Sequence, residues 1–164
     1  MRWRTRRAWG GLVVGLGLGL AIAGCAAEPL LPPPMPPDLR VVPPPPGVPR
    51  EHARYSGRWV GKWEGQLEHV LVVELEVDHG EITEVVAVYS WGVAPALGVG
   101  EPGWARARGR IENGALRLDL TRVQATAVYV LRADGTLEGE YWRGTVLVSR
   151  VRMTRGIAER GGRP

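Results

Sequence analysis

From residue 55 to about residue 154, apolar and polar residues alternate with a period of two, and glycine-rich turns interrupt the alternation. Successive side chains of a strand point to opposite faces, so this pattern is typical of strands that bury one face. No segment of the region keeps an apolar stripe at the helical spacing of 3.6 residues. The pattern therefore predicts an all-β domain.

Eight segments of alternation follow one another, joined mostly by short turns. They cover residues 57–64, 67–78, 82–91, 105–112, 116–120, 123–132, 136–143 and 145–154. Asn113-Gly114 is the strongest hairpin signal, because a type I′ turn needs positive φ at both central residues. Segment 82–91 is apolar on both faces, which indicates cover on both sides. Closing such a meander removes its edges, so we predict a single small antiparallel up-and-down barrel of about eight strands.

The first 24 residues have the pattern of a secretory signal peptide. Four arginines lie within the first eight residues, and an uncharged stretch runs from Trp9 to about Ile22. That stretch, roughly 14 residues, is shorter than the ~20 that span a bilayer comfortably. We therefore predict a signal peptide over residues 1–24, with an uncleaved signal anchor as the alternative.

Leu20-Ala21-Ile22-Ala23-Gly24-Cys25 resembles the lipobox of bacterial lipoproteins, and Cys25 is the only cysteine in the chain. The resemblance implies cleavage before Cys25 and its modification with acyl chains such as palmitate, which anchor the protein to a membrane. Ala26, not an acidic residue, follows the cysteine. In Gram-negative bacteria that pattern implies the outer membrane, with the domain facing the periplasm.

Prolines make up eleven of the 21 residues from Pro29 to Pro49. Such a run favours an extended polyproline II helix, which at about 3.1 Å per residue reaches roughly 65 Å. We therefore predict a disordered proline-rich linker over residues 25–54 that acts as a spacer, the alternative being a ligand for a proline-binding groove. The barrel domain is expected at residues 55–155 and a disordered tail at 156–164.

The formal charge of +4 for the whole chain would invite a nucleic-acid partner. The four arginines of the signal peptide are its only charges, however, and without them 17 basic and 17 acidic residues remain. A neutral mature chain lacks the electrostatic footprint of phosphate binding. Nucleic acid is therefore excluded as a partner.

Gly57-x-Trp59 on the first strand, with Arg150 and Arg152 on the last, resembles the lipocalin and wider calycin pattern, and avidin-like barrels also begin with Gly-x-Trp. The resemblance implies that Trp59 closes the barrel base beneath Arg150 or Arg152. Trp63 lies on the same strand face as Trp59, and we expect it to be a structural residue of the barrel closure as well. Eight strands enclose only enough space for side chains or for one small ligand.

The candidate binding site is the long apolar loop between Trp91 and Trp104, because loops of this length in compact domains are often functional. The two indole rings offer large contact area with an N–H donor, and Glu101 is the loop's one charge. The ligand-binding candidates are therefore Trp91, Trp104, Glu101 and Tyr129, and a cavity bordered by Trp91, Trp104 and Tyr129 would favour ligand binding over a solid core. The alternative is that the loop plugs the barrel and completes its core.

Enzyme signatures are missing from the sequence. His52, His69 and His79 have no metal-ligand spacing, and no serine lies in a nucleophile elbow. We therefore expect no catalysis, metal or cofactor. The resulting hypothesis is a membrane-anchored envelope lipoprotein whose small barrel binds a small apolar or amphipathic ligand. The alternative is a structural module with a filled barrel that binds an envelope protein.

Overall fold

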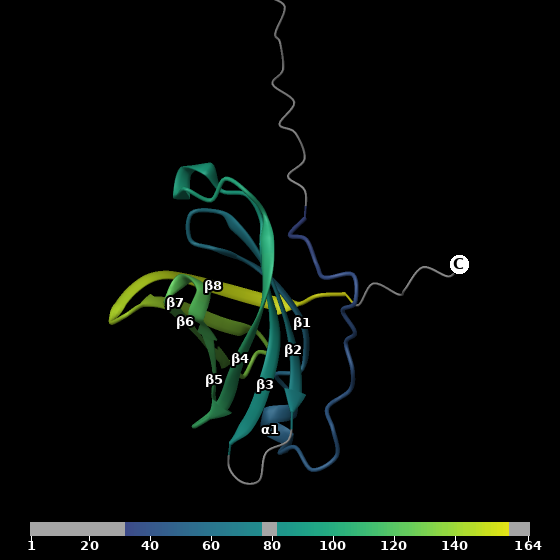
Figure 1. The fold of residues 1–164 in the computed structure, drawn as a ribbon. Coiled ribbons are helices and arrows are strands. Elements are labelled where there is room, and N and C mark those ends of the chain that lie inside the picture. Colours follow the sequence, from purple (N-terminus) through teal and green to yellow (C-terminus); the bar gives the residue numbers. More distant parts are fainter. Residues whose placement is uncertain (1–31, 77–81, 158–164) are drawn as a thin grey trace, which may run out of the picture.

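Eight antiparallel strands pair in sequence order, and β8 returns to pair with β1, which closes the barrel (Figure 1). The computed structural model describes residues 32–76 and 82–157. The strands are β1 Gly57–Trp63, β2 Leu67–Glu76, β3 Thr83–Trp91, β4 Gly103–Glu112, β5 Ala115–Leu120, β6 Ala125–Leu131, β7 Leu137–Arg143 and β8 Val146–Arg155. Three short helices accompany them: α1 Arg50–Ala53, η1 Pro95–Leu97 and η2 Thr121–Val123. The predicted all-β up-and-down barrel is confirmed.

The barrel has two ends of different construction. The connections β1–β2, β3–β4, β5–β6 and β7–β8 lie at one end, which we call the mouth, and α1 lies at the other end, the base (Figure 1). At the base, Asn113 and Gly114 join β4 to β5 with φ values of 50° and 72°. The hairpin predicted from this dipeptide is confirmed.

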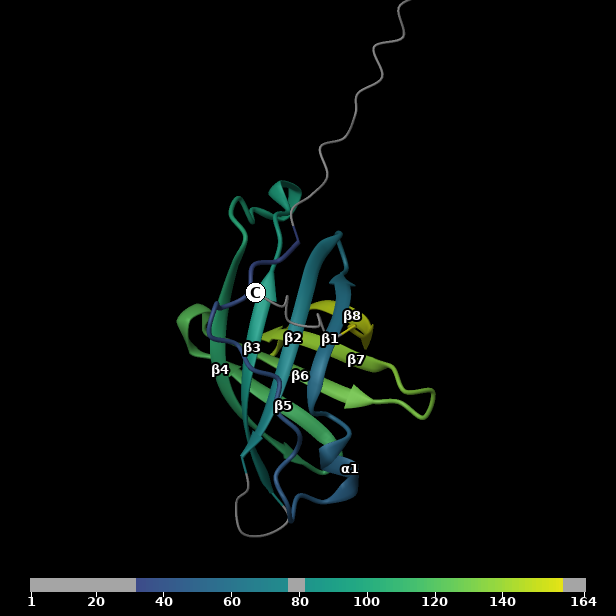
Figure 2. The ribbon, with the colours of Figure 1, turned by 90° about the vertical axis from the view of Figure 1, so that its right-hand side faces the viewer.

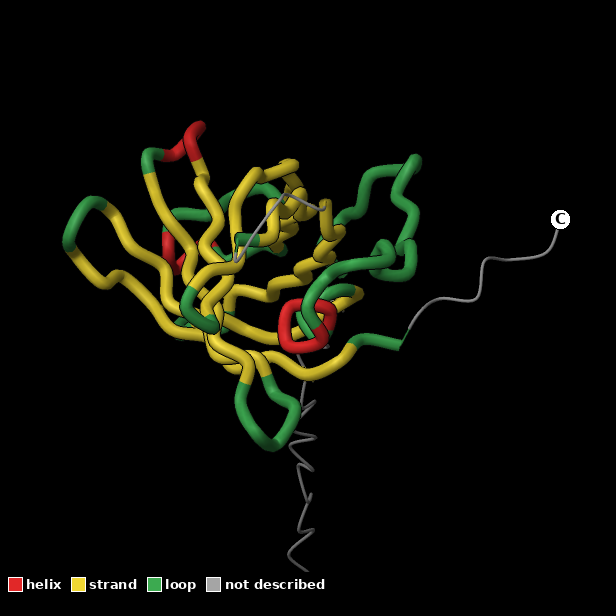
Figure 3. The backbone as a smooth tube through the Cα atoms, turned by 90° about the horizontal axis from the view of Figure 1, so that it is seen from below, coloured by secondary structure: helices red, strands yellow, loops and turns green. Residues whose placement is uncertain are grey.

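Inward-facing side chains fill the barrel between these ends, and the strands surround this common interior when viewed from below (Figure 3). Alternate residues of each strand are buried, as the period of two requires. The largest fully buried apolar side chains are those of Trp59, Tyr129, Leu71, Ile111, Leu116, Leu118, Leu137 and Met153. The apolar interior is continuous from the base to the level of Trp63.

Residues 32–49, which we call the strap, lie along the outside of the barrel (Figure 2). Met35 and Leu39 pack against the outward side chains of Val70, Val72 and Val88 on β2 and β3. This contact provides the outer cover that the two apolar faces of β3 predicted. We predicted a free, extended spacer from the proline content. Residues 32–49 are not free, because Met35 and Leu39, which lie between the prolines, pack against the outer face of β2 and β3.

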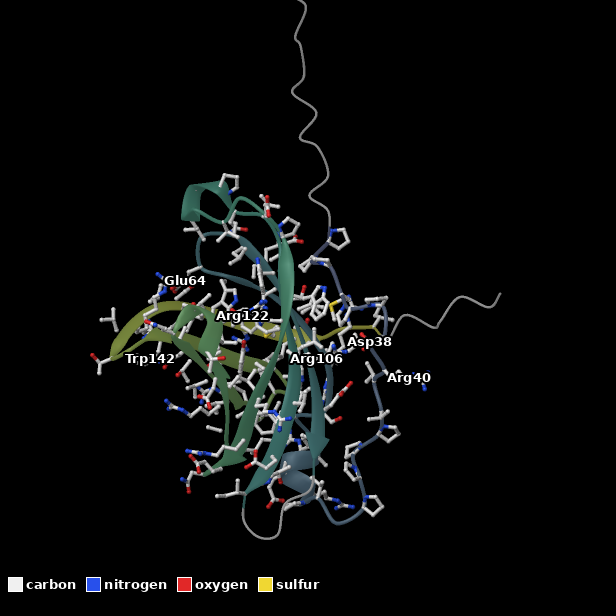
Figure 4. All side chains as sticks on the ribbon, viewed as in Figure 1. Asp38, Arg40, Glu64, Arg106, Arg122 and Trp142 are labelled. Carbon is white, nitrogen blue, oxygen red and sulfur yellow. The ribbon has the colours of Figure 1, made fainter. Side chains whose placement is uncertain are left out.

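Two polar contacts fix the strap to the same face. The Ser90 hydroxyl donates to the carbonyl oxygen of Pro34 at 2.5 Å, and Arg106 forms an ion pair with Asp38 at 2.8 Å (Figure 4). The strap ends at α1, where the imidazole Nδ1 of His52 hydrogen-bonds with Thr83 Oγ1 at 2.8 Å.

Cys25, the signal peptide, His79 and residues 158–164 of the expected tail lie outside the described residues. Within residues 32–76 and 82–157, no helix is long and apolar enough to cross a bilayer.

Candidate functional site

A cavity of about 950 Å³ opens at the mouth of the barrel. The β1–β2, β3–β4 and β5–β6 connections contribute to its wall together with the adjoining ends of β7 and β8, and apolar or aromatic side chains dominate the inner part. Its deeper lining comes from Trp63, Leu67, Tyr89, Trp91, Ala107, Leu120 and Tyr141. Ligand sites in proteins occupy about 300–1,000 Å³ and have walls of this composition.

Aromatic rings form the floor of this cavity. The ring of Trp63 lies 6.5 Å from that of Tyr89 and 6.0 Å from that of Tyr141, centroid to centroid. Tyr89 in turn lies 6.3 Å from Trp91. Because inward residues of alternate strands can share one layer of a barrel, β1, β3 and β7 bring these rings together.

His69 lies directly beneath this floor with both ring nitrogens engaged. Its Nδ1 contacts the carbonyl oxygen of Ser90 at 2.7 Å, and its Nε2 contacts the Tyr129 hydroxyl at 2.9 Å. A carbonyl only accepts, so Nδ1 carries the proton and Nε2 accepts from Tyr129. Burial lowers the pKa of His69 to about 4, against the smaller opposing effect of the Ser90 carbonyl. The imidazole is therefore neutral near pH 7.

The tyrosine hydroxyls around His69 are also neutral. Burial raises the pKa of Tyr129 well above its usual value, and Tyr89 adds to the effect. Burial likewise raises the pKa of Tyr89, with a smaller contribution from Tyr141 and against a smaller opposing effect of the neighbouring Trp63 side chain. The floor thus carries polar atoms but no charge.

Two polar atoms that face this region have no hydrogen-bond partner among the described residues: Nε1 of Trp63 and Oγ of Ser149. Both residues line the cavity, and the Trp63 side chain is only 3% exposed. A buried donor without a partner costs about 1–3 kcal/mol. A ligand atom that accepts a hydrogen bond here would remove that cost.

The loop between β3 and β4 forms one wall of the cavity. Gly98, Val99 and Gly100 line it, and the loop folds on itself through a bridge between Ala94 and Val99. Leu97 leans on the β1–β2 turn, since a Cβ added at Gly65 would lie 2.8 Å from its Cδ1. The loop is therefore a wall rather than the plug that the alternative prediction described.

Trp91 is held at the edge of this wall. Its Nε1 donates to the carbonyl oxygen of Glu101 at 3.2 Å. Gly103 leaves room for the ring, because a Cβ at that position would lie 2.6 Å from Trp91 Cζ2. Two of the ligand-binding candidates, Trp91 and Glu101, line the cavity.

Trp104 and Tyr129 do not line the cavity as expected. Trp104 is on the outer face of β4, 37% exposed, where the guanidinium of Arg106 lies 5.6 Å from its ring. Tyr129 is fully buried and reaches His69 instead. The outward position of Trp104 follows from the alternation of the strand, because Gly103 and Ala105 on either side of it point inward.

At the base, Trp59 packs beneath Arg155 and not beneath Arg150 or Arg152. The guanidinium of Arg155 lies 3.9 Å from the centre of the Trp59 ring and donates to the carbonyl oxygens of Ser56 and Arg54. The Trp59 Nε1 donates to the Tyr55 carbonyl at 2.9 Å. The base is thus closed by the kind of Trp–Arg contact that the calycin resemblance implied, with a different arginine.

The predicted arginines are both on the outer face of β8. Arg150 pairs with Glu140 at 3.3 Å and Arg152 with Asp134 at 2.5 Å, all in exposed positions. The inward positions of the strand go to Val151 and Met153, and Arg155 shares their parity. Trp63, predicted as structural, is buried but belongs to the cavity floor.

The sequence reasoning did not select His69, Tyr89, Tyr141 or Ser149. A usable signal was present, since His69 alternates with Leu67 and Leu71, and Tyr89 with Ala87 and Trp91. Inward polar residues on otherwise apolar strand faces mark the interior of a barrel. Among the described residues, no group of three or more histidines, cysteines or carboxylates is arranged to hold a metal ion.

Comparison with known proteins adds no assignment to this geometry. The sequence matches no protein-family model and no curated protein.

Proposed function

We propose that this protein is a membrane-anchored envelope lipoprotein whose barrel binds one small apolar or amphipathic ligand in the mouth cavity. The observation that carries the proposal is an apolar cavity of about 950 Å³ with unpaired polar atoms at its inner end. The apolar walls favour a hydrocarbon or ring system. Trp63 Nε1 and Ser149 Oγ favour a carbonyl, carboxyl or hydroxyl group at the inner end of the ligand.

Binding rather than catalysis is supported by the chemistry of the interior. His69 does not line the cavity, and both of its nitrogens already have partners. The carboxylates Glu64, Glu101 and Asp119 belong to the wall near the mouth turns, apart from the aromatic floor. A general acid or base must reach the reacting atoms, and the floor has no group placed for that task.

The alternative of a filled barrel that docks an envelope protein has less support. Its premise was a solid interior, and the open cavity argues against that premise. The periplasmic outer-membrane location remains part of the proposal and rests on the lipobox resemblance of residues 20–25 and on Ala26.

Native mass spectrometry of the protein purified from its host membrane would detect a retained ligand. A defined probe, a dansyl-labelled C11 fatty acid, can then be titrated by energy transfer from tryptophan. Trp91→Ala removes a cavity wall and is expected to weaken probe binding about tenfold, which corresponds to about 1.4 kcal/mol.

Trp104→Ala is the matched control, because it removes the same side chain from the outer face. It should leave the dissociation constant of the probe unchanged. Equal affinities of wild type and Trp91→Ala, or no saturable binding at all, would remove the mouth cavity as the site.

A further inference from the structure

Exposed apolar side chains gather at the mouth. Of the nine large apolar side chains that are exposed within the described residues, five surround this end of the barrel. They are Leu97, Trp104, Val123, Val146 and Val148, with exposed fractions of 49%, 37%, 52%, 63% and 51%. They come from the β3–β4 loop and the adjoining start of β4, from η2 and from the start of β8. We call them the apolar rim.

The strap fixes which end of the barrel is closer to the amino terminus. Pro34 contacts Ser90, next to the last residue of β3, and the Ser90 hydroxyl oxygen also lies 3.2 Å from the carbonyl oxygen of Gly103. Both residues are at the mouth end. The strap then descends the outside of the barrel to His52, which contacts Thr83 at the base (Figure 2). The described part of the chain therefore begins, at residue 32, at the mouth end (Figure 1).

Only a short length of chain separates this point from the predicted lipid. From Cys25 to Pro32 there are seven Cα steps, which span at most about 25 Å even when fully extended. Without the strap contacts, the run to Pro49 would allow the roughly 65 Å reach of a free spacer. The strap thus shortens the tether to less than half.

We propose that the apolar rim docks onto the lipid bilayer that holds the Cys25 anchor, so that the cavity opens toward the membrane surface. The proposal rests on the proposed function and names its ligand source: a lipid or lipid fragment from that same membrane. The mouth carries charges of both signs, with Glu64, Glu101 and Asp119 beside Arg122 and Arg143. Attraction to anionic lipid therefore adds little, and apolar contact carries the docking.

Site-specific labels on the full lipidated chain in proteoliposomes test this orientation. Lipidation occupies the sulfur of Cys25, so an introduced cysteine is the one free thiol. Val146→Cys places an NBD fluorophore on the rim, and Ala133→Cys places it in the exposed β6–β7 turn at the base. The vesicles contain phosphatidylethanolamine and phosphatidylglycerol, with or without a spin-labelled phospholipid that quenches NBD on contact.

We expect the spin-labelled lipid to quench the Val146→Cys label at least about twofold and to leave the Ala133→Cys label unquenched. Equal quenching at both positions would overturn the proposal. Protection of the Val146→Cys label from a soluble quencher in cells but not in proteoliposomes would also overturn it, in favour of a protein partner. A chain that does not float with the vesicles would overturn the lipid anchor on which the proposal rests.

Releasing the strap provides a second, independent measurement. The double variant Met35→Asp/Leu39→Asp removes its apolar contacts with β2 and β3 and should reduce the difference in quenching between the two labels. Asp38→Ala is the control, because it removes only an exposed ion pair from the same segment. An unchanged difference after strap release would show that the strap does not orient the barrel.

Ligand retention by native mass spectrometry separates this proposal from the proposed function. Val146 is not among the cavity-lining residues, so its label leaves the site intact. A retained ligand without quenching at the rim would overturn the docking proposal and leave the proposed ligand binding intact. Quenching at the rim with an empty cavity would overturn the proposed ligand binding and leave the docking of the rim onto the membrane intact.

Discussion

At the base of the barrel, Trp59 is fully buried beneath Arg155, and its indole nitrogen is hydrogen-bonded. At the mouth, Trp63 is almost as buried but its indole nitrogen has no partner among the described residues. The two side chains lie on the same face of β1, four residues apart. Their surroundings differ because the base is filled with aliphatic side chains while the mouth opens into a cavity.

This difference indicates that the base of the barrel contributes mainly to stability and the mouth mainly to ligand binding. Inside the base, the Tyr55 hydroxyl has partners on both sides: it donates to the Gly114 carbonyl at 2.7 Å and accepts from the Leu131 amide at 3.1 Å. The mouth leaves donors unpaired and apolar surface exposed, which costs stability. Substitutions at the base should therefore affect unfolding, and matched substitutions at the mouth should affect ligand binding.

The largest contrast is expected between two tryptophans. Trp59→Ala leaves a cavity in a packed core and should lower the free energy of unfolding by about 3–5 kcal/mol, whereas Trp91→Ala should cost at most about 1–2 kcal/mol. Urea unfolding followed by circular dichroism measures both. If Trp59→Ala does not fold, Trp59→Leu keeps the comparison, with a smaller loss than Trp59→Ala. Equal losses at Trp59 and Trp91 would contradict the division into two halves.

A glycine pair tests the same division through backbone packing. A Cβ at Gly109 would lie 2.0 Å from the carbonyl oxygen of Arg117 on β5, whereas a Cβ at Gly100 in the mouth loop meets no atom within 4 Å. Gly109→Ala should destabilise by about 3 kcal/mol through forced separation of the strands, and Gly100→Ala should have no measurable effect. Thermal unfolding of the two variants provides the measurement. A stable Gly109→Ala protein would mean that β4 and β5 separate more easily than their register suggests.

His69, at the boundary of the two halves, should make stability depend on pH. Its folded pKa of about 4 is below the unfolded value near 6.5, so the unfolded chain takes up a proton first as the pH falls. The contribution of His69 is complete above pH 6.5 and is lost as the pH falls toward 4. From pH 7 to pH 5 the loss is about 2 kcal/mol.

Urea unfolding at several pH values measures this slope, and His69→Gln is the variant that isolates it. The free energy of unfolding of the variant should lack the loss that His69 causes between pH 7 and pH 5. The carboxylates contribute equally in both proteins, so the difference between them isolates His69. A slope that persists in His69→Gln would assign the dependence to other groups.

The barrel could be predicted from the sequence because its determinants are local. The period of two and the Asn113-Gly114 turn act over a few residues, and each strand segment agrees with the structure to within about three residues. The strap could not be predicted in the same way. Proline content reveals missing backbone donors, but it does not reveal that Met35 and Leu39 would meet the outer face of β2 and β3.

The sequence predicted only part of the site, because its candidate residues were chosen mainly for being in or next to the β3–β4 loop. Trp91 and Trp104 both border the loop, yet only Trp91 has inward parity. Ala105 and Ala107 alternate with arginines and are therefore the inward residues of β4, and their parity would have excluded Trp104. The unpaired state of Trp63 Nε1 and Ser149 Oγ depends on packing between distant strands, and no local pattern records it.

The smallest contrast separates two arginines of β8 that are three residues apart. Arg155→Ala removes a guanidinium stacked on Trp59 together with its hydrogen bonds to two carbonyls, and should cost about 1–2 kcal/mol. Arg152→Ala removes an exposed ion pair with Asp134 and should cost less than about 1 kcal/mol, decreasing further with added salt. Chemical unfolding at low and high salt measures both effects. Arg155→Lys should not restore stability, because an ammonium group cannot reproduce the planar stack and the forked donation. Full rescue by lysine, or a larger loss at Arg152, would show that charge rather than stacking closes the base.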